Sequence, residues 1–144
     1  MGRANEALEQ IRLAQGYDPL SLAINTDVGF HYYYTAQYAE ATKQLQTVLG
    51  MNRDFALAHL WLGRTFQQLG RYDDALAQLR QAEPAFRDWP VLIAARGSTE
   101  GASGRTKEAK RTAAELESLS ASRFVTSYDA PQFRRAFIAI GRQS

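Results

Sequence analysis

A motif of six residues recurs along this chain at intervals of 34 residues. Residues 2–7 (GRANEA), 70–75 (GRYDDA) and 104–109 (GRTKEA) all begin with Gly-Arg and end with Ala, and a looser copy begins at Ala36. Gly29, Gly63 and Gly97 keep the same spacing. A fixed period of this length is typical of helical repeat arrays, in which each unit buries its apolar face against its neighbours. The sequence therefore predicts an all-α, α-α superhelical solenoid.

Apolar spacing within each period indicates how the helices cross. Leu62, Gly63 and Phe66 lie at i, i+1 and i+4, so they share one face of a helix. A glycine inside a helix costs roughly 1 kcal/mol relative to alanine. We therefore expect a second helix to cross close to Gly63, with Ala75 as the matching small residue, and the period before it has the same pattern.

This pattern resembles the tetratricopeptide repeat, which has a Leu-Gly pair, an aromatic three residues later, a Gly-x-Tyr turn and then small and apolar residues. The third block supplies Leu62, Gly63, Phe66, Gly70, Tyr72, Ala75, Leu79 and Ala82. The resemblance implies a single domain over residues 1–144: a half repeat (1–21, second helix only), repeats at 22–55, 56–89 and 90–123, and a capping segment (124–144). In the last repeat, Glu100 occupies the aromatic position.

The repeat register also predicts where helices begin and end. Helices are expected near 4–16, 20–35, 38–50, 54–69, 72–83, 90–103 and 106–119, with a short one near 131–140. Pro84 should end the helix before it, because proline lacks the N–H that the helix needs. Trp89 and Pro90 offer a helix start. Residues 97–104 (GSTEGASG) have low helix propensity, so a helix there depends on packing.

A narrower resemblance concerns residues 56–70 and 116–130. They are similar to the tetratricopeptide region that follows bacterial signalling domains in winged-helix transcriptional activators, class III adenylate cyclases and some Ser/Thr kinases. The resemblance implies a regulatory context within a larger protein. The half repeat at the start of the chain fits the same interpretation, because its apolar face has no partner. The alternative is a homodimer that covers the half repeat.

Catalysis has little support in the sequence. The chain has no cysteine, and His31 and His59 have no metal-ligand motif around them, so both are interpreted as packing or surface residues. The glycines near Lys107 do not form a phosphate-binding loop. No apolar run approaches the roughly 20 residues that cross a bilayer, and no signal peptide is evident. We expect a non-enzymatic cytoplasmic protein without cofactors or bound metal, and no membrane partner.

The resemblance implies that the first helix of each repeat lines a concave surface. The residues that the register places there, together with Trp61 beside them, are Thr26, Phe30, Tyr33, Tyr34, Leu60, Trp61, Arg64, Gln67 and Gln68. Aromatic rings beside an arginine are typical of binding hot spots. The sequence therefore predicts a protein–protein interaction scaffold that binds a protein or peptide. The open alternative is an autoinhibitory or self-association module, in which the chain's own segments cover these rings.

Two partner classes are not expected. Family members that hold an Hsp70 or Hsp90 C-terminal tail use Lys, Asn and Arg, and those positions here are Thr26, Phe30, Trp61, Val91 and Ala95. Nucleic acid is also not expected, because the basic residues of the C-terminal third alternate with acidic ones and the net charge is only +2.

Overall fold

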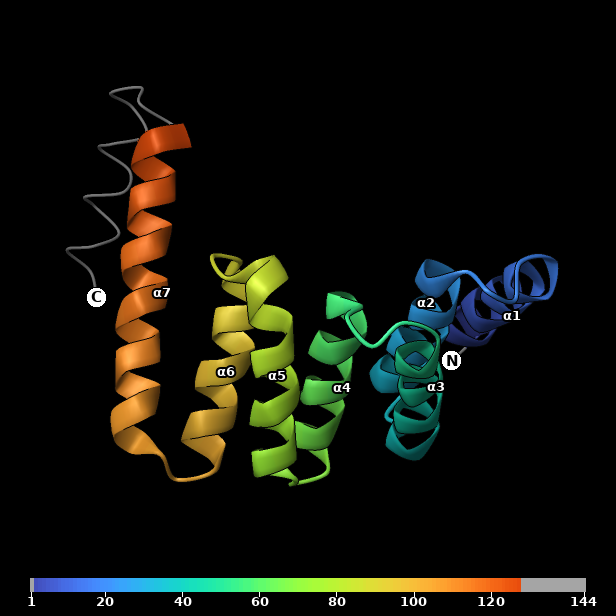
Figure 1. The fold of residues 1–144 in the computed structure, drawn as a ribbon, viewed down its shortest axis with the longest axis horizontal. Helices are drawn as coiled ribbons and strands as arrows, with labels where there is room; N and C mark the ends of the chain where they lie inside the picture. The colour runs from blue at the N-terminus through green and yellow to red at the C-terminus, as the bar shows by residue number, and fades with distance from the viewer. Residues whose placement is uncertain (1, 128–144) are drawn as a thin grey trace.

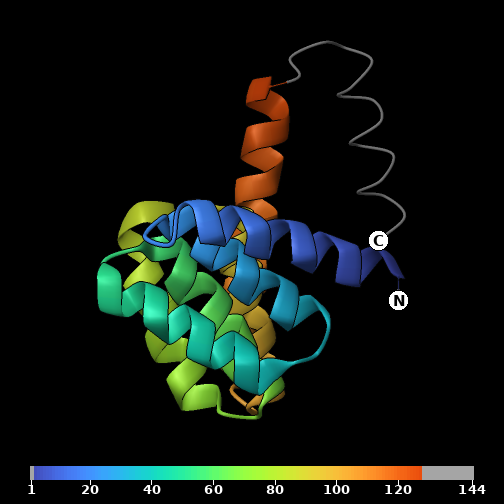
Figure 2. The ribbon, with the colours of Figure 1, turned by 90° about the vertical axis from the view of Figure 1, so that its right-hand side faces the viewer.

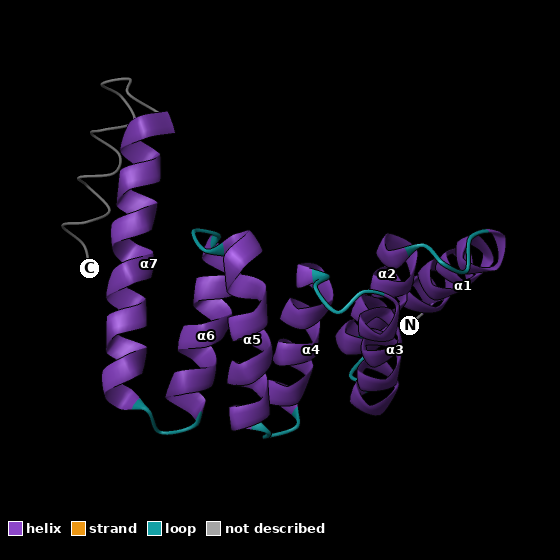
Figure 3. Ribbon diagram, viewed as in Figure 1, coloured by secondary structure: helices purple, strands orange, loops and turns teal. Residues whose placement is uncertain are grey.

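In a computed structural model of the protein, residues 2–127 are described, and they form seven α-helices with no strand in that range (Figure 3). The helices are α1 (Gly2–Tyr17), α2 (Leu22–Tyr34), α3 (Tyr38–Met51), α4 (Ala56–Gln68), α5 (Tyr72–Phe86), α6 (Pro90–Ala102) and α7 (Thr106–Ser127). The all-α prediction is confirmed. The helix expected near 131–140 lies outside the described residues.

The helices pack in antiparallel pairs that follow the 34-residue period (Figure 1). Helix α2 packs on α3, α4 on α5 and α6 on α7, while α3–α4 and α5–α6 contacts join one pair to the next. Helix α2 also contacts α4, and α4 contacts α6, whereas no comparable contact joins α3 to α5 within residues 2–127. The first helices therefore lie closer together than the second helices, which places α2, α4 and α6 on the inner side of the superhelix.

The glycines inside the first helices sit where the paired helix crosses most closely. A Cβ atom on Gly29 would lie 2.6 Å from the Leu45 side chain, and one on Gly63 would lie 2.9 Å from the Leu79 side chain. These separations are shorter than real Cβ contacts, so any larger residue would force the leucine side chain to shift. The predicted crossing is confirmed, but a leucine is the nearest neighbour. For Gly63, the Ala75 carbonyl oxygen follows at 3.2 Å.

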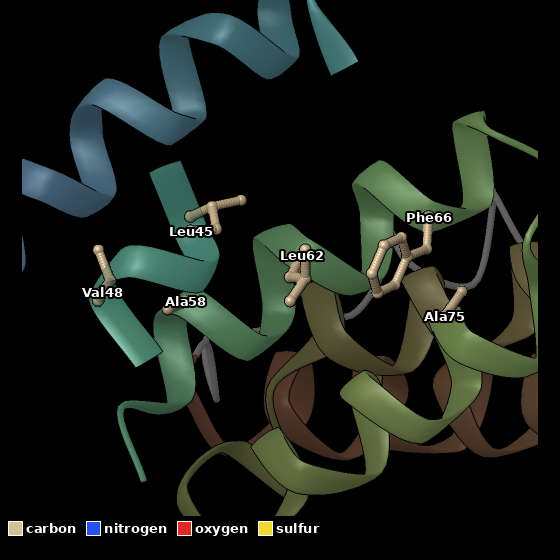
Figure 4. Close-up of a cluster of buried hydrophobic side chains, with 6 residues drawn as sticks. All are labelled: Leu45, Val48, Ala58, Leu62, Phe66 and Ala75. Carbon is tan, nitrogen blue, oxygen red and sulfur yellow. The ribbon is translucent and has the colours of Figure 1, made fainter. Parts of the chain in front are cut away.

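The core is a series of clusters that each bridge neighbouring helices. One cluster joins α3, α4 and α5 (Figure 4) and contains Leu45, Val48, Ala58, Leu62, Phe66 and Ala75. A second joins α4, α5 and α6 and contains Ala56, Leu60, Leu79, Ala82, Leu92 and Ala95. Because each helix pair completes its apolar burial against the next pair, the stack is stabilised by burial between neighbouring repeats.

Three turns within the repeats share one backbone conformation. Ala36, Gly70 and Gly104 have φ angles of +58°, +75° and +82°. In the first turn, the Gln37 N–H donates to the Tyr32 carbonyl (2.8 Å) and the Ala36 N–H donates to the Tyr33 carbonyl (3.0 Å). The same two bonds recur in the other two turns. This is the Schellman pattern of bonds, which ends a helix with one left-handed residue. The six-residue motif therefore begins at the residue that reverses the chain.

In α6, a buried acidic residue replaces the aromatic of the repeat. Glu100 is 8% exposed, and the Thr112 hydroxyl of α7 donates a 2.7 Å hydrogen bond to its Oε2. Arg96 lies 3.8 Å from the other carboxylate oxygen and also pairs with Glu83 of α5 and Glu115 of α7. Buried charges need such partners. A polar network thus joins α5, α6 and α7 where the earlier repeats bury a ring.

Two predicted helix ends are wrong. Helix α5 continues through Pro84 to Phe86. Pro84 is exposed, and it removes only one backbone hydrogen bond near the end of the helix. Phe86 packs on the second core cluster, and its ring centroid lies 4.8 Å from that of Trp89. Helix α7 runs to Ser127 instead of residue 119 and crosses the boundary expected at residue 123, because residues 106–127 contain no glycine or proline. It extends past its neighbours (Figures 1 and 2).

Other expected ends are confirmed. Helix α6 begins at Pro90, where proline needs no intrahelical partner for its nitrogen. Its glycine-rich end is helical to Ala102. A Cβ atom on Gly97 would lie 3.0 Å from the Thr112 methyl group. The low helix propensity of this stretch is therefore offset by close packing on α7.

Candidate functional site: an aromatic cluster on the concave side

The predicted aromatic residues form one cluster across α2 and α4. We call Phe30, Tyr33, Tyr34, Trp61 and Arg64 the aromatic cluster. The ring centroids of Phe30 and Trp61 are 4.5 Å apart, and those of Tyr33 and Trp61 are 5.5 Å apart. On α2 itself, Phe30 lies 4.6 Å from Tyr34. These separations are in the range of favourable aromatic pairs. The cluster therefore bridges two repeats on the inner side of the superhelix.

Arg64 completes the cluster with a cation. Its guanidinium carbon lies 5.4 Å from the Trp61 ring centroid and 5.6 Å from the Tyr33 ring centroid. Both distances are within the range of cation–π attraction. Contact with two rings restricts where the guanidinium can point. The arginine is therefore held between Tyr33 of α2 and Trp61 of α4.

The members of the cluster differ in how far they are exposed. Tyr34 is 69% exposed, while Phe30, Tyr33, Trp61 and Arg64 are half-buried. Tyr33 also packs on the core cluster of Val28, Tyr32 and Ala41, and Trp61 packs on the cluster of Figure 4. Tyr33 and Trp61 therefore contribute both to the aromatic cluster and to the packing of the core. Tyr34 is the ring that can be changed with the least effect on folding.

Two residues predicted on the concave surface are buried instead. Leu60 is 0% exposed because Leu92 and Ala95 of the following repeat cover it. Thr26, at the equivalent position one repeat earlier, is 1% exposed, and its hydroxyl donates to the Leu22 carbonyl at 2.6 Å. This register position faces the next repeat, so neither side chain can contact a partner. The prediction is wrong for both.

The concave side becomes polar toward the C-terminal repeat. Gln67 of α4 donates a 2.7 Å hydrogen bond from its side-chain amide to the Ser98 hydroxyl of α6. Gln68 is exposed beside it. The inner surface therefore has an aromatic part between α2 and α4 and an uncharged polar part between α4 and α6.

Tyr38 and His31 also contact the aromatic cluster, although they are absent from the residues predicted for the site. The Tyr38 ring centroid lies 5.9 Å from that of Tyr33, and His31 makes an edge contact with Phe30 at 5.7 Å. Tyr38 is the first residue of α3, immediately after the turn, so the turn returns it toward α2. The five-residue spacing of the two tyrosines across a predicted turn is the signal that could have found this contact.

The histidines serve packing, as predicted. His59 is 8% exposed, and its ring nitrogens each lie 2.7 Å from an oxygen, one of the Gln78 side chain and one of the Arg53 carbonyl. Among residues 2–127, no group of three or more His, Asp or Glu side chains could hold a metal ion. Within the same range, no helix has the length and apolarity required to cross a bilayer.

Comparison with known proteins agrees with the repeat. Residues 35–97 match the family model described as "Tetratricopeptide repeat", and this segment is a little under half of the chain. A search of curated protein sequences gives no match. The matched segment runs from the end of α2 into α6, and the described helices on either side of it continue the same pairing.

Solved structures with the same fold are distant in sequence. A structure titled "MamA MSR-1 C2" is 20% identical, with a TM-score of 0.69 over 84% of this chain and 70% of that one. A second crystal structure of MamA protein is 17% identical, with a TM-score of 0.71 over 88% and 68% of the two chains. A tetratricopeptide repeat protein from Parabacteroides merdae is 18% identical, with a TM-score of 0.73 over 86% of this chain and 48% of that one.

The family match over residues 35–97 and the shared fold make the described part of the chain similar to the class of tetratricopeptide repeat proteins. Proteins of this class generally act as scaffolds for protein–protein interaction and are typically non-catalytic.

Proposed function

We propose that the aromatic cluster is the binding site for a peptide or protein segment. The observation that carries this proposal is the position of the cluster: four rings and a cation lie together on the inner side of the superhelix, and Tyr34 is 69% exposed there. Tyrosine, tryptophan and arginine are the residue types most enriched at hot spots of protein interfaces. The buried sides of Tyr33 and Trp61 hold the cluster in one arrangement, which lowers the entropy lost on binding.

A random dodecapeptide library displayed on phage tests the proposal with the full chain. Peptides selected on the protein are synthesised with a fluorescent label, and their affinities are measured by fluorescence anisotropy. We expect Tyr34→Ala to weaken binding by about 30-fold, which corresponds to roughly 2 kcal/mol for a hot-spot residue. Tyr17→Ala is the matched control, because Tyr17 is 92% exposed on α1 and its ring contacts no member of the aromatic cluster. Equal affinities for the Tyr34 variant and the wild type would refute the site.

The competing function is autoinhibition, in which a segment of the same chain covers the aromatic cluster. A synthetic peptide of residues 128–144 is therefore included among the ligands. If this peptide binds and is displaced by the selected peptides, the autoinhibitory alternative is favoured. If it does not bind, the cluster is free for an external partner.

We also infer a regulatory context for the repeat array. The inference rests on the similarity of residues 56–70 and 116–130 to tetratricopeptide regions of bacterial signalling proteins. An antibody raised against the repeats should detect a polypeptide much larger than 144 residues in the source cells. Detection of only a 144-residue product would contradict the inference.

A further inference from the structure

Among the described residues, Arg64 has no carboxylate partner, in contrast to three other arginines of the repeats. Arg71 pairs with Asp74, Arg96 with three glutamates and Arg105 with Asp73. No Asp or Glu among residues 2–127 lies within ion-pair distance of Arg64, although its side chain is half-buried. Arg64 instead contacts the rings of Tyr33 and Trp61.

Contact with aromatic rings leaves the hydrogen-bonding capacity of a guanidinium group largely unused. Attraction to an aromatic ring uses the π-face of that ring and leaves guanidinium N–H groups free to donate. Those N–H groups form a rigid planar fork that matches the two oxygens of a carboxylate. A guanidinium that is already fixed by two rings loses less freedom when such a carboxylate binds.

The surroundings of Arg64 favour an anion. Its contacts, Tyr33 and Trp61, are uncharged, and so are the other residues predicted for the concave side of α2 and α4. Asp27, which is exposed on α2, is not within ion-pair distance. Arg64 is therefore a single uncompensated positive charge beside aromatic surface, where the effective dielectric constant is lower than in water.

We propose that the segment bound at the aromatic cluster carries an aspartate or glutamate two residues from an apolar or aromatic side chain. The carboxylate binds the Arg64 guanidinium, and the apolar side chain packs against Phe30, Tyr34 and Trp61. In an extended peptide, side chains two residues apart are on the same side and about 6.6 Å apart. This spacing is comparable to the 5.4 Å between the Arg64 guanidinium carbon and the Trp61 ring centroid. The proposal rests on the proposed function and specifies its ligand.

A single-stranded nucleic acid would offer a phosphate and a stacking base, which is related chemistry. Such binding generally needs a groove with several cations along the backbone. Arg64 is the one charged residue among those predicted for the concave side of residues 22–89. An acidic peptide therefore fits the site better.

The test uses the selected peptides and compares each acidic peptide with its amide analogue, in which Asp becomes Asn or Glu becomes Gln. We expect the selected set to contain an acidic residue two positions from an apolar one, and the acidic form to bind at least 10-fold more tightly. On Arg64→Gln this preference should disappear, and on Arg64→Lys it should be reduced. Arg80→Gln is the matched control, because Arg80 is exposed on α5 and should leave the preference unchanged. An oligouridine of ten nucleotides should bind more weakly than the acidic peptide.

The failures of the two proposals can be told apart. Peptides that lose affinity with Tyr34→Ala but show no acidic preference, or keep it with Arg64→Gln, overturn this inference and leave the binding site standing. Tighter binding of oligouridine than of every peptide also overturns it. A library that yields no peptide overturns both.

Discussion

Ala36, Gly70 and Gly104 hold the same place in successive turns, and all three have positive φ angles. In the left-handed region, a residue with a side chain has a conformational free energy about 1–2 kcal/mol higher than in the right-handed region. Glycine has almost no such cost. The first turn therefore stores strain that the other two avoid. It forms because the Schellman hydrogen bonds and the packing of α2 on α3 require the same reversal.

Exchanging alanine and glycine at positions 36 and 70 tests whether the left-handed backbone of the turn is the source of this strain. Ala36→Gly should raise the free energy of unfolding by about 0.5–1 kcal/mol, because relief of strain exceeds the extra entropy of glycine in the unfolded chain. Gly70→Ala should lower it by a similar amount. Urea denaturation followed by circular dichroism measures both. If both substitutions change stability in the same direction, the left-handed turn is not the cause.

Residue position also explains how far helical spacing could locate the candidate site residues. Tyr34 and Arg64 could be placed on the concave side from helical spacing alone. Leu60 and Thr26 follow the same spacing but face the next repeat. Helical periodicity gives the direction of a side chain around its own axis. It does not show which neighbouring helix covers that direction.

Helices α5 and α6 show that the effect of a proline depends on its position in the helix. Helix α5 contains Pro84 in its last turns, and α6 begins with Pro90. The first proline removes an N–H that would donate to the Arg80 carbonyl, whereas the second removes an N–H that has no partner within its helix. Only the first therefore weakens the helix in which it lies.

The two prolines form a matched pair for mutation. Pro84→Ala should raise the free energy of unfolding by about 1–2 kcal/mol, since the hydrogen bond is restored at an exposed position and this gain exceeds the added entropy of the unfolded chain. Pro90→Ala should have no stabilising effect and should lower stability by up to about 1 kcal/mol. Thermal unfolding monitored at 222 nm compares the two. A loss of stability with Pro84→Ala would show that the proline is needed for the turn into α6.

At the scale of the whole molecule, stability is spread unevenly along the stack. Helix α4 contributes to two core clusters and contacts α2, α3, α5 and α6. Helix α1 has no fully buried residue and packs mainly on α2, through Leu8 and Ile11. In a solenoid, each repeat is stabilised mainly by its immediate neighbours. The ends should therefore open more readily than the middle.

Hydrogen exchange measured by mass spectrometry should resolve this gradient. Peptides from α4 should exchange slowest, and peptides from α1 should exchange at least 10-fold faster, because opening of α1 breaks only one interface. Leu62→Ala in the core should speed exchange in α4 and its neighbours more than in α1. Uniform exchange across all helices would instead indicate a single cooperative unit.

The 34-residue period by itself determined the all-α class, the pairing of helices and the close crossings at Gly29 and Gly63. These properties depend on the spacing of apolar and small residues within each repeat, and that spacing is visible in the sequence. Tertiary structure decided the burial of Thr26 and Leu60, the role of Tyr33 in the core, the continuation of α5 and α7, and the lack of a carboxylate partner for Arg64. Each of these depends on contacts between neighbouring helices. Such contacts are set by the combined packing of several side chains, and the period of one helix does not contain that information.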